Sequence, residues 1–144
     1  MKKFFLIFIS FIFLSCSDRN EKVLSSIDDF ERNMGKWNDL TEDLLKDEIV
    51  NQKLETLIKV TDLNPSIYNR LHKENVVYVI VTNNPNCQKV EYQKEWSSSF
   101  GTQYLEWTSC DSIKTQKGYY EDLNPIHVFG IGNKWLTWID LDPI

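Results

Sequence analysis

The sequence predicts an α+β fold in which N-terminal helices pack on one face of an antiparallel meander sheet of five or six strands. Apolar residues recur every three or four positions up to Asn75, which is the periodicity of amphipathic helices. Beyond Asn75, β-branched and aromatic segments alternate with turn-forming Asn, Gly and Pro residues. Because no helical segment separates these strands, neighbouring strands are expected to pair antiparallel through short turns.

The first residues have the layout of a secretory signal. Lys2 and Lys3 precede the apolar run FFLIFISFIFL at positions 4–14. As a helix this run is roughly 16 Å long, about half of the ~30 Å hydrocarbon core that a spanning helix must cross. A positive start, a short apolar core and a polar continuation predict an export signal and not a membrane-spanning helix.

The end of this signal carries a recognisable cleavage sequence, Phe13-Leu14-Ser15-Cys16. It resembles the lipobox of bacterial lipoproteins, in which a small residue precedes the cysteine, although Phe13 stands where that pattern has an aliphatic residue. The resemblance implies cleavage before Cys16 and attachment of lipid, palmitate included, to this cysteine. The alternative is an ordinary signal peptide in which Cys16 has no special role.

The resemblance divides the chain into a lipoprotein signal peptide at 1–15, a lipidated tether at 16–22 and a single α+β domain at 23–144. It implies anchoring to a membrane of the bacterial cell envelope, in contact with the periplasm, with the outer membrane favoured over the inner. Removing residues 1–15 takes away two lysines and no acidic residue, so the formal net charge falls from −5 to −7. An acidic chain without a basic cluster is not expected to bind nucleic acid.

The helical half has three expected segments. Apolar residues at helical spacing over 23–34 predict a first helix, which Gly35 is expected to end. The same spacing over 37–60 predicts either one helix or two helices separated near Asn51. Asn64 followed by proline is typical of a helix start and predicts a short helix after it.

The next two predicted strands form a hairpin after a central strand over 76–81. Symmetric closure of the 97–101 loop pairs Val90 with Trp107 and places Cys87 opposite Cys110. Directly opposed residues lie ~4.5–5.5 Å apart, which a disulfide tolerates. In an exported chain this predicts a disulfide, worth roughly 3 kcal/mol for such a loop. The alternative is two buried free thiols, and the register carries one cost: it opposes Glu91 to Glu106.

The last third predicts another hairpin, with strands over 126–131 and 134–141. Gly132-Asn133 between them suits a two-residue type II′ turn, and the resulting register sets Trp135 opposite Gly130. Apolar residues occur on both faces of this hairpin, whereas helices can cover only one face. Either another part of the chain covers the second face, or that face binds a partner.

Tryptophan and tyrosine are concentrated in the strand half, and both suit protein interfaces and stacking on saccharides. The sequence therefore predicts a non-enzymatic binding protein for a protein partner or other ligand. The candidate binding residues are Trp135, Trp138, Tyr119 and Tyr120. Trp135 is expected to be the outward-facing tryptophan, because Gly130 opposite it leaves an open platform.

Evidence for catalysis in the sequence is sparse, since none of the common hydrolase, nucleotide or zinc motifs occurs. One alternative is a small hydrolase-like enzyme that uses His127 with Glu121 or Asp140. In the predicted register, however, His127 opposes Trp138 and would pack against it. Another alternative is an inhibitor or immunity-type protein. The scattered carboxylates are interpreted as a solvated acidic rim, and neither a metal nor a cofactor is expected.

Overall fold

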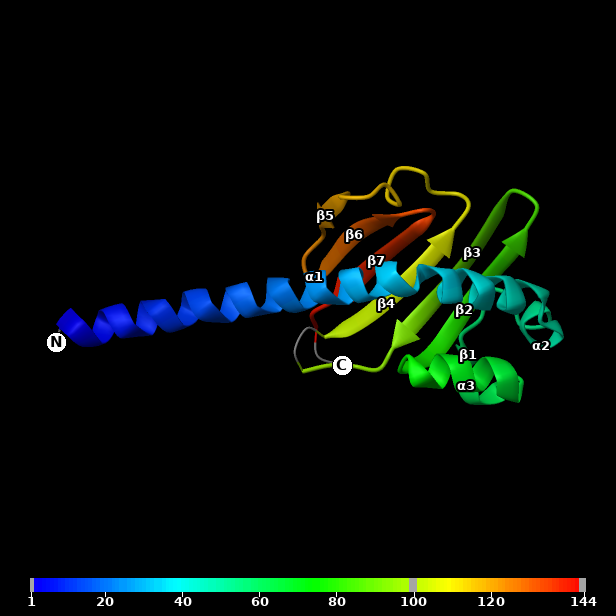
Figure 1. Cartoon of the computed structure of the whole chain (residues 1–144), viewed down its shortest axis with the longest axis horizontal. Coiled ribbons are helices and arrows are strands. Elements are labelled where there is room, and N and C mark those ends of the chain that lie inside the picture. Colours follow the sequence, from blue (N-terminus) through cyan, green and yellow to red (C-terminus); the bar gives the residue numbers. More distant parts are fainter. Residues whose placement is uncertain (1, 99–100, 143–144) are drawn as a thin grey trace.

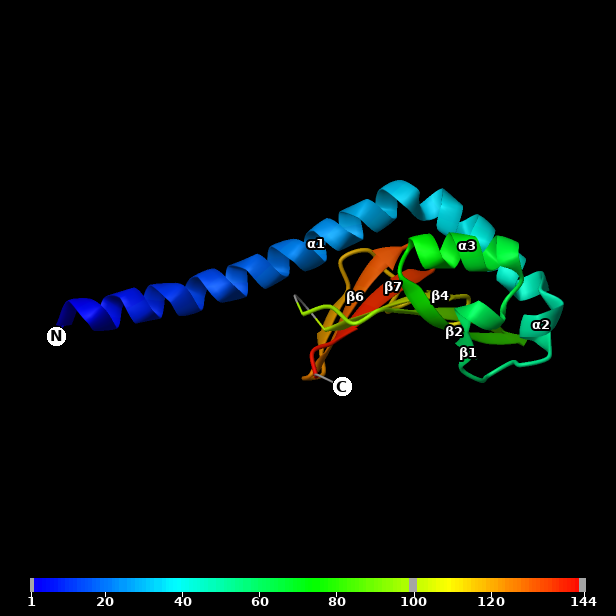
Figure 2. The same ribbon diagram turned by 90° about the horizontal axis from the view of Figure 1, so that it is seen from below.

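The computed structural model describes the chain over residues 2–98 and 101–142, with side chains described from residue 21 onward. It has two layers, one sheet and the helices on one of its faces (Figures 1 and 2). The helical elements are α1 (Lys2–Lys46), α2 (Glu48–Asn51), a 3-10 turn η1 (Val60–Asp62) and α3 (Pro65–Lys73). The strands are β1 (Ile58–Lys59), β2 (Val76–Asn84), β3 (Cys87–Lys94), β4 (Thr102–Thr108), β5 (Tyr120–Asp122), β6 (Ile126–Gly132) and β7 (Trp135–Asp140).

The α+β class is confirmed, but the expected meander of five or six strands is wrong. The sheet has seven strands in the order β1-β2-β3-β4-β7-β6-β5, and all neighbours are antiparallel. After β4 the chain crosses to the far edge through residues 109–119 and returns strand by strand, so that the last strand, β7, pairs with β4. The additional strand, β1, is only two residues long and carries too little pattern to be recognised in sequence.

The long helix α1 does not end at Gly35, contrary to the sequence prediction. It continues to Lys46 because the apolar face continues past the glycine: Phe30, Trp37 and Leu40 are all buried. A glycine inside a helix costs about 1 kcal/mol relative to alanine, which burial of one large side chain exceeds. The polar segment 16–22 is also helical. Within the part of the chain whose residues are described, no helix is both long and apolar enough to cross a membrane.

Four aromatic rings form the centre of the core between α1 and the sheet. Phe30 and Trp37 of α1 pack against Tyr92 of β3 and Trp135 of β7, with ring centroids 4.8–6.3 Å apart. The buried polar atoms in this cluster are paired. The Tyr92 hydroxyl lies 2.7 Å from the hydroxyl of Thr41, and the Trp135 indole N–H donates to Asn38 Oδ1 at 2.8 Å.

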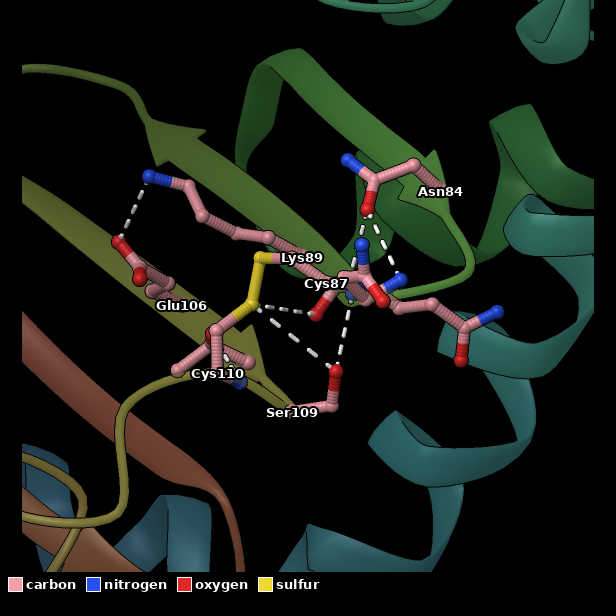
Figure 3. Close-up of a disulfide and its surroundings, with 9 residues drawn as sticks. Asn84, Cys87, Lys89, Glu106, Ser109 and Cys110 are labelled. Carbon is pink, nitrogen blue, oxygen red and sulfur yellow. Dashed lines mark hydrogen bonds and ion pairs between the residues drawn. A yellow bond between two sulfur atoms is a disulfide. The ribbon is translucent and has the colours of Figure 1, made fainter.

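The register predicted for the β3–β4 hairpin is confirmed, and so is its disulfide. Val90 pairs with Trp107, and Cys87 is bonded to Cys110 with their Cα atoms 5.2 Å apart (Figure 3). The backbone is fixed beside the disulfide by side chains. Asn84 Oδ1 accepts from the Cys87 N–H at 2.8 Å, and Ser109 Oγ accepts from the Gln88 N–H at 2.9 Å.

The opposed glutamates of this hairpin are bridged by a lysine. Lys89 Nζ lies 3.4 Å from a Glu91 carboxylate oxygen and 3.3 Å from a Glu106 carboxylate oxygen. Burial raises the pKa of Glu106, and the nearby Lys89 ammonium offsets part of that rise. The lysine side chain points to the same face as both carboxylates, so its ammonium offsets part of the repulsion that the register implied.

Replacing both Cys87 and Cys110 with alanine is expected to lower the free energy of unfolding by about 3 kcal/mol. The disulfide joins two residues 23 positions apart and so reduces the conformational entropy of the unfolded chain. Urea denaturation with and without reductant measures this loss. Reductant should destabilise the native protein and leave the double variant unchanged. Two freely alkylatable thiols in exported, unreduced protein would contradict the disulfide itself.

The register predicted for the last hairpin is wrong by one residue. Ile126 pairs with Asp140 and Gly130 with Leu136, and the pairing then shifts so that Gly132 lies opposite Trp135. The turn consists of Asn133 and Lys134, both with positive φ, so it is of type I′ and not the expected type II′. Compared with the predicted register, this shift changes which residues of β6 and β7 share a face of the sheet.

Candidate ligand cleft

A cleft opens on the helical side of the sheet, between α1 and α3 and above β3 and β4. Its cavity measures ≈ 380 Å³. Apolar walls come from Phe30, Trp37 and Leu105, and polar groups enter from all the surrounding elements. The polar lining residues are Lys22, Ser25, Ser26, Asp29, Asn33, Glu74, Lys94 and Gln103. A second hollow of ≈ 420 Å³ between α1 and α3 shares Asn33, Trp37 and Glu74 with it, so the two lie next to each other.

Lys94, the last residue of β3, is the distinctive group in this cleft. Its ammonium lies over the Trp37 ring, 5.8 Å from the centroid. Within the described part of the chain, no carboxylate lies within 4 Å of it. Burial lowers the pKa of Lys94, and the more distant carboxylates of Glu74 and Asp29 offset part of that shift. The cleft thus holds a partly desolvated cation for which the described residues supply no ion-pair partner.

The opposite wall of the cleft is fixed by a hydrogen-bonded side chain of β4. Gln103 is buried, and its amide nitrogen donates to Ser26 Oγ at 3.0 Å and to Thr137 Oγ1 at 3.2 Å. The Thr137 hydroxyl in turn donates to the Tyr104 carbonyl at 2.7 Å. This chain of bonds ties α1 to two central strands and gives the cleft a preformed polar wall.

The two cleft residues from the strands could have been identified from sequence. Lys94 continues the inward alternation of Val90 and Tyr92, and Gln103 has the same parity as Leu105. Long polar residues at positions that alternation assigns to the core are uncommon unless their polar groups are satisfied. Neither residue is aromatic or part of a catalytic motif, so only its position in the alternation marks it as a site residue.

The predicted binding residues do not form one surface. Trp135 is completely buried under α1, so the expectation that it faces outward is wrong; the one-residue shift of the last hairpin is the reason. Trp138 faces the other side of the sheet, half-buried, and stacks on Tyr104 with centroids 3.6 Å apart. Tyr119 donates to Glu121, whereas Tyr120 is 54% exposed and bonds to His127.

The residues of the enzymatic alternative are also separated. Strand pairing sets Glu121 opposite Val128 and Asp140 opposite Ile126, so both carboxylates point to the face opposite that of His127. The neighbours of the His127 Nδ1 atom are instead the Tyr120 hydroxyl at 3.0 Å and an Asp122 oxygen at 3.7 Å. The expected contact between His127 and Trp138 is likewise absent, because His127 pairs with Ile139. Among residues 21–98 and 101–142, no three His, Cys, Asp or Glu side chains are grouped to hold a metal.

The face of the sheet away from the helices is partly covered by the chain itself. A Cβ placed on Gly130 would lie 2.0 Å from the Gln116 carbonyl oxygen and 2.5 Å from that of Lys114, so the crossing segment 109–119 contacts the sheet there. Lys114 also pairs with Glu121 at 3.2 Å. The bare backbone of Gly130 therefore accommodates this segment and not a tryptophan ring.

No protein-family model, curated protein or solved structure matches this chain.

Proposed function

We propose that the chain is the precursor of a lipid-anchored protein of the bacterial cell envelope, and that its mature domain is a non-enzymatic binding protein for a small organic anion. The observation that carries the proposal is the partly desolvated ammonium of Lys94, which lies in a preformed cleft and has no ion-pair partner among the described residues. The signal and lipobox resemblance of residues 1–16 support the anchor. The separation of His127 from Glu121 and Asp140 favours binding over the hydrolase-like alternative.

The cleft has the size and composition of a small-molecule site. Its ≈ 380 Å³ lies within the roughly 300–1,000 Å³ of typical ligand pockets, which combine apolar walls with few polar groups. A ligand anion near Lys94 would compensate the desolvation of the ammonium through a charge-assisted hydrogen bond. Phe30, Trp37 and Leu105 would contact the rest of the ligand. A carboxylate attached to an apolar or ring-shaped body meets both requirements.

A second candidate is a protein partner on the opposite face of the sheet. The stacked pair of Tyr104 and Trp138 favours this function, because half-buried aromatic side chains are common at protein interfaces. The inhibitor or immunity-type alternative would use this same face. The anion cleft is favoured over this face because the half-buried cation of the face, Lys89, is already paired with Glu91 and Glu106.

Lys94→Met tests the anion site. It is expected to weaken binding of 4-phenylbutyrate about 10- to 100-fold, the equivalent of a lost charge-assisted hydrogen bond. Titration calorimetry measures the affinity, with 4-phenylbutanol and 4-phenylbutylamine as neutral and cationic probes of similar length. Stability should change by less than about 1 kcal/mol, because the lost cation–π contact is offset by relief of the buried charge.

Lys134→Met is the matched control, because Lys134 also lies over a tryptophan, with its ammonium 5.3 Å from the Trp107 centroid, but outside the cleft. It should bind 4-phenylbutyrate like the native protein. For the native protein, affinity should fall as the pH rises through the lowered pKa of Lys94, at lower pH than for an ordinary lysine. Equal binding of all three probes, or an unchanged affinity of Lys94→Met, would refute the anion site.

A further inference from the structure

One end of the sheet lies where α1 leaves the domain toward its N-terminus (Figures 1 and 2). Strand pairing aligns Thr102 with Asp140 and Asp140 with Ile126, so β4 and β6 begin at this end and β7 finishes there. The hydrogen bonds between Ser26 and Gln103 hold α1 above the same row. We call this the anchor end, because residue 16 lies along α1 beyond it.

Three large apolar side chains are exposed at the anchor end. Trp96, two residues beyond β3, is 49% exposed, and Leu123, in the turn between β5 and β6, is 53% exposed. Leu24 on α1 is 58% exposed. We define these three residues as the anchor-end rim. They come from three separate segments of the chain, yet the fold brings them to one end of the molecule.

We propose that the anchor-end rim contacts the lipid bilayer in which the protein is anchored. This inference rests on the proposed lipid anchor at Cys16. Eight residues of helix separate Cys16 from Leu24, which is about 12 Å, so the rim cannot lie far from the headgroups. Tryptophan is favoured at this depth, since its ring is apolar and its N–H remains hydrogen-bonded.

The charges near the rim define the kind of lipid surface. The exposed charged residues nearest to the rim on its own segments are Glu21, Lys22, Glu95, Asp122 and Asp142, so acidic side chains predominate there. Such acidic groups are repelled by anionic headgroups, whereas zwitterionic headgroups leave the apolar contacts as the main attraction. The rim therefore suits a zwitterionic surface such as phosphatidylcholine or phosphatidylethanolamine. One consequence is that the cleft, which Lys22 and Ser25 also line, lies close to the membrane.

The test uses the mature, lipidated protein reconstituted into phosphatidylcholine vesicles with bromine on the upper acyl carbons. Bromine quenches tryptophan only at close range. The emission assigned to Trp96, taken as native protein minus Trp96→Phe, should fall roughly twofold, as expected for an indole at the membrane interface. Replacing part of the lipid with phosphatidylglycerol should reduce this quenching.

A tryptophan at the opposite end of the sheet is the matched control. Ile113 is 65% exposed on the segment between β4 and β5, so Ile113→Trp in the Trp96→Phe background should remain unquenched. Flotation of the same vesicles in a density gradient tests the lipid anchor independently of the rim. Protein that floats without quenching of Trp96, or with equal quenching at position 113, overturns the rim and leaves the anchor intact. Protein that does not float overturns both.

Discussion

Replacing Trp135 with alanine is expected to lower the free energy of unfolding by about 3–5 kcal/mol, the range for a fully buried large aromatic residue. The ring contacts Phe30 and Trp37 of α1 and Tyr92 of the sheet, so its removal leaves a cavity where the two layers meet. The substitution also removes the indole N–H that donates a hydrogen bond to Asn38 Oδ1. Since domains are stable by only about 5–15 kcal/mol, a large part of the native stability is lost.

Trp138→Ala is the matched comparison, because it removes the same side chain from the adjacent part of the same strand. Trp138 is half-buried and stacks on Tyr104, so we expect a smaller loss that includes about 0.5–1.5 kcal/mol for the ring pair. Urea denaturation of both variants measures the difference. Equal destabilisation would contradict the assignment of Trp135 to the helix-covered face and Trp138 to the opposite face.

The hairpin of β3 and β4 shows what the sequence could predict. Its register follows from the alternation of apolar residues, and it correctly opposed Cys87 to Cys110 and Val90 to Trp107. Both signals are local, since they lie within 24 consecutive residues and refer to one loop. The helical periodicity before Asn75 correctly predicted helix over α1, α2 and α3, but the helix expected up to Val60 was wrong, because the chain leaves helical structure after Asn51 and forms β1 at Ile58–Lys59. The periodicity could not show that α1 continues through Gly35, which it does because apolar side chains are buried both before and after this glycine.

The last hairpin shows where local patterns fail. A turn was correctly predicted here, but its placement at Gly132-Asn133 was wrong: Asn133 and Lys134 form the turn, both with positive φ, and a bulge at the end of β6 absorbs one residue. A one-residue shift moves every side chain to the other face of a strand. The wrong direction of Trp135 followed directly. Asn133 of the observed turn contacts Met34 of α1, with its Nδ2 atom 3.4 Å from the sulfur, and no local window of the sequence contains that contact.

The strand order and the cleft depended on contacts between distant segments. Pairing of β4 with β7 joins residues more than 25 positions apart, and neither strand carries a feature that selects the other. The cleft combines α1, the end of α3, β3 and β4. The sequence did contain one unused clue, namely that Lys94 and Gln103 occupy inward positions of their strands.

Replacing Cys16 with serine is expected to abolish both cleavage before residue 16 and incorporation of radiolabelled palmitate. The sulfur is the only side-chain atom at this position that can form the thioether on which the proposed lipid is carried, and a hydroxyl does not replace it. Stable anchoring requires more than one acyl chain, so the Cys16→Ser variant should lack the acyl anchor and keep its uncleaved export signal. Ser15→Ala is the matched control, because it keeps a small residue before the cysteine and should be processed and labelled normally. Gel mobility, palmitate labelling and membrane fractionation of the three proteins measure the result. If the Cys16→Ser variant still incorporated palmitate, the label would have to reside elsewhere in the chain, and the lipobox assignment of Phe13-Leu14-Ser15-Cys16 would be wrong.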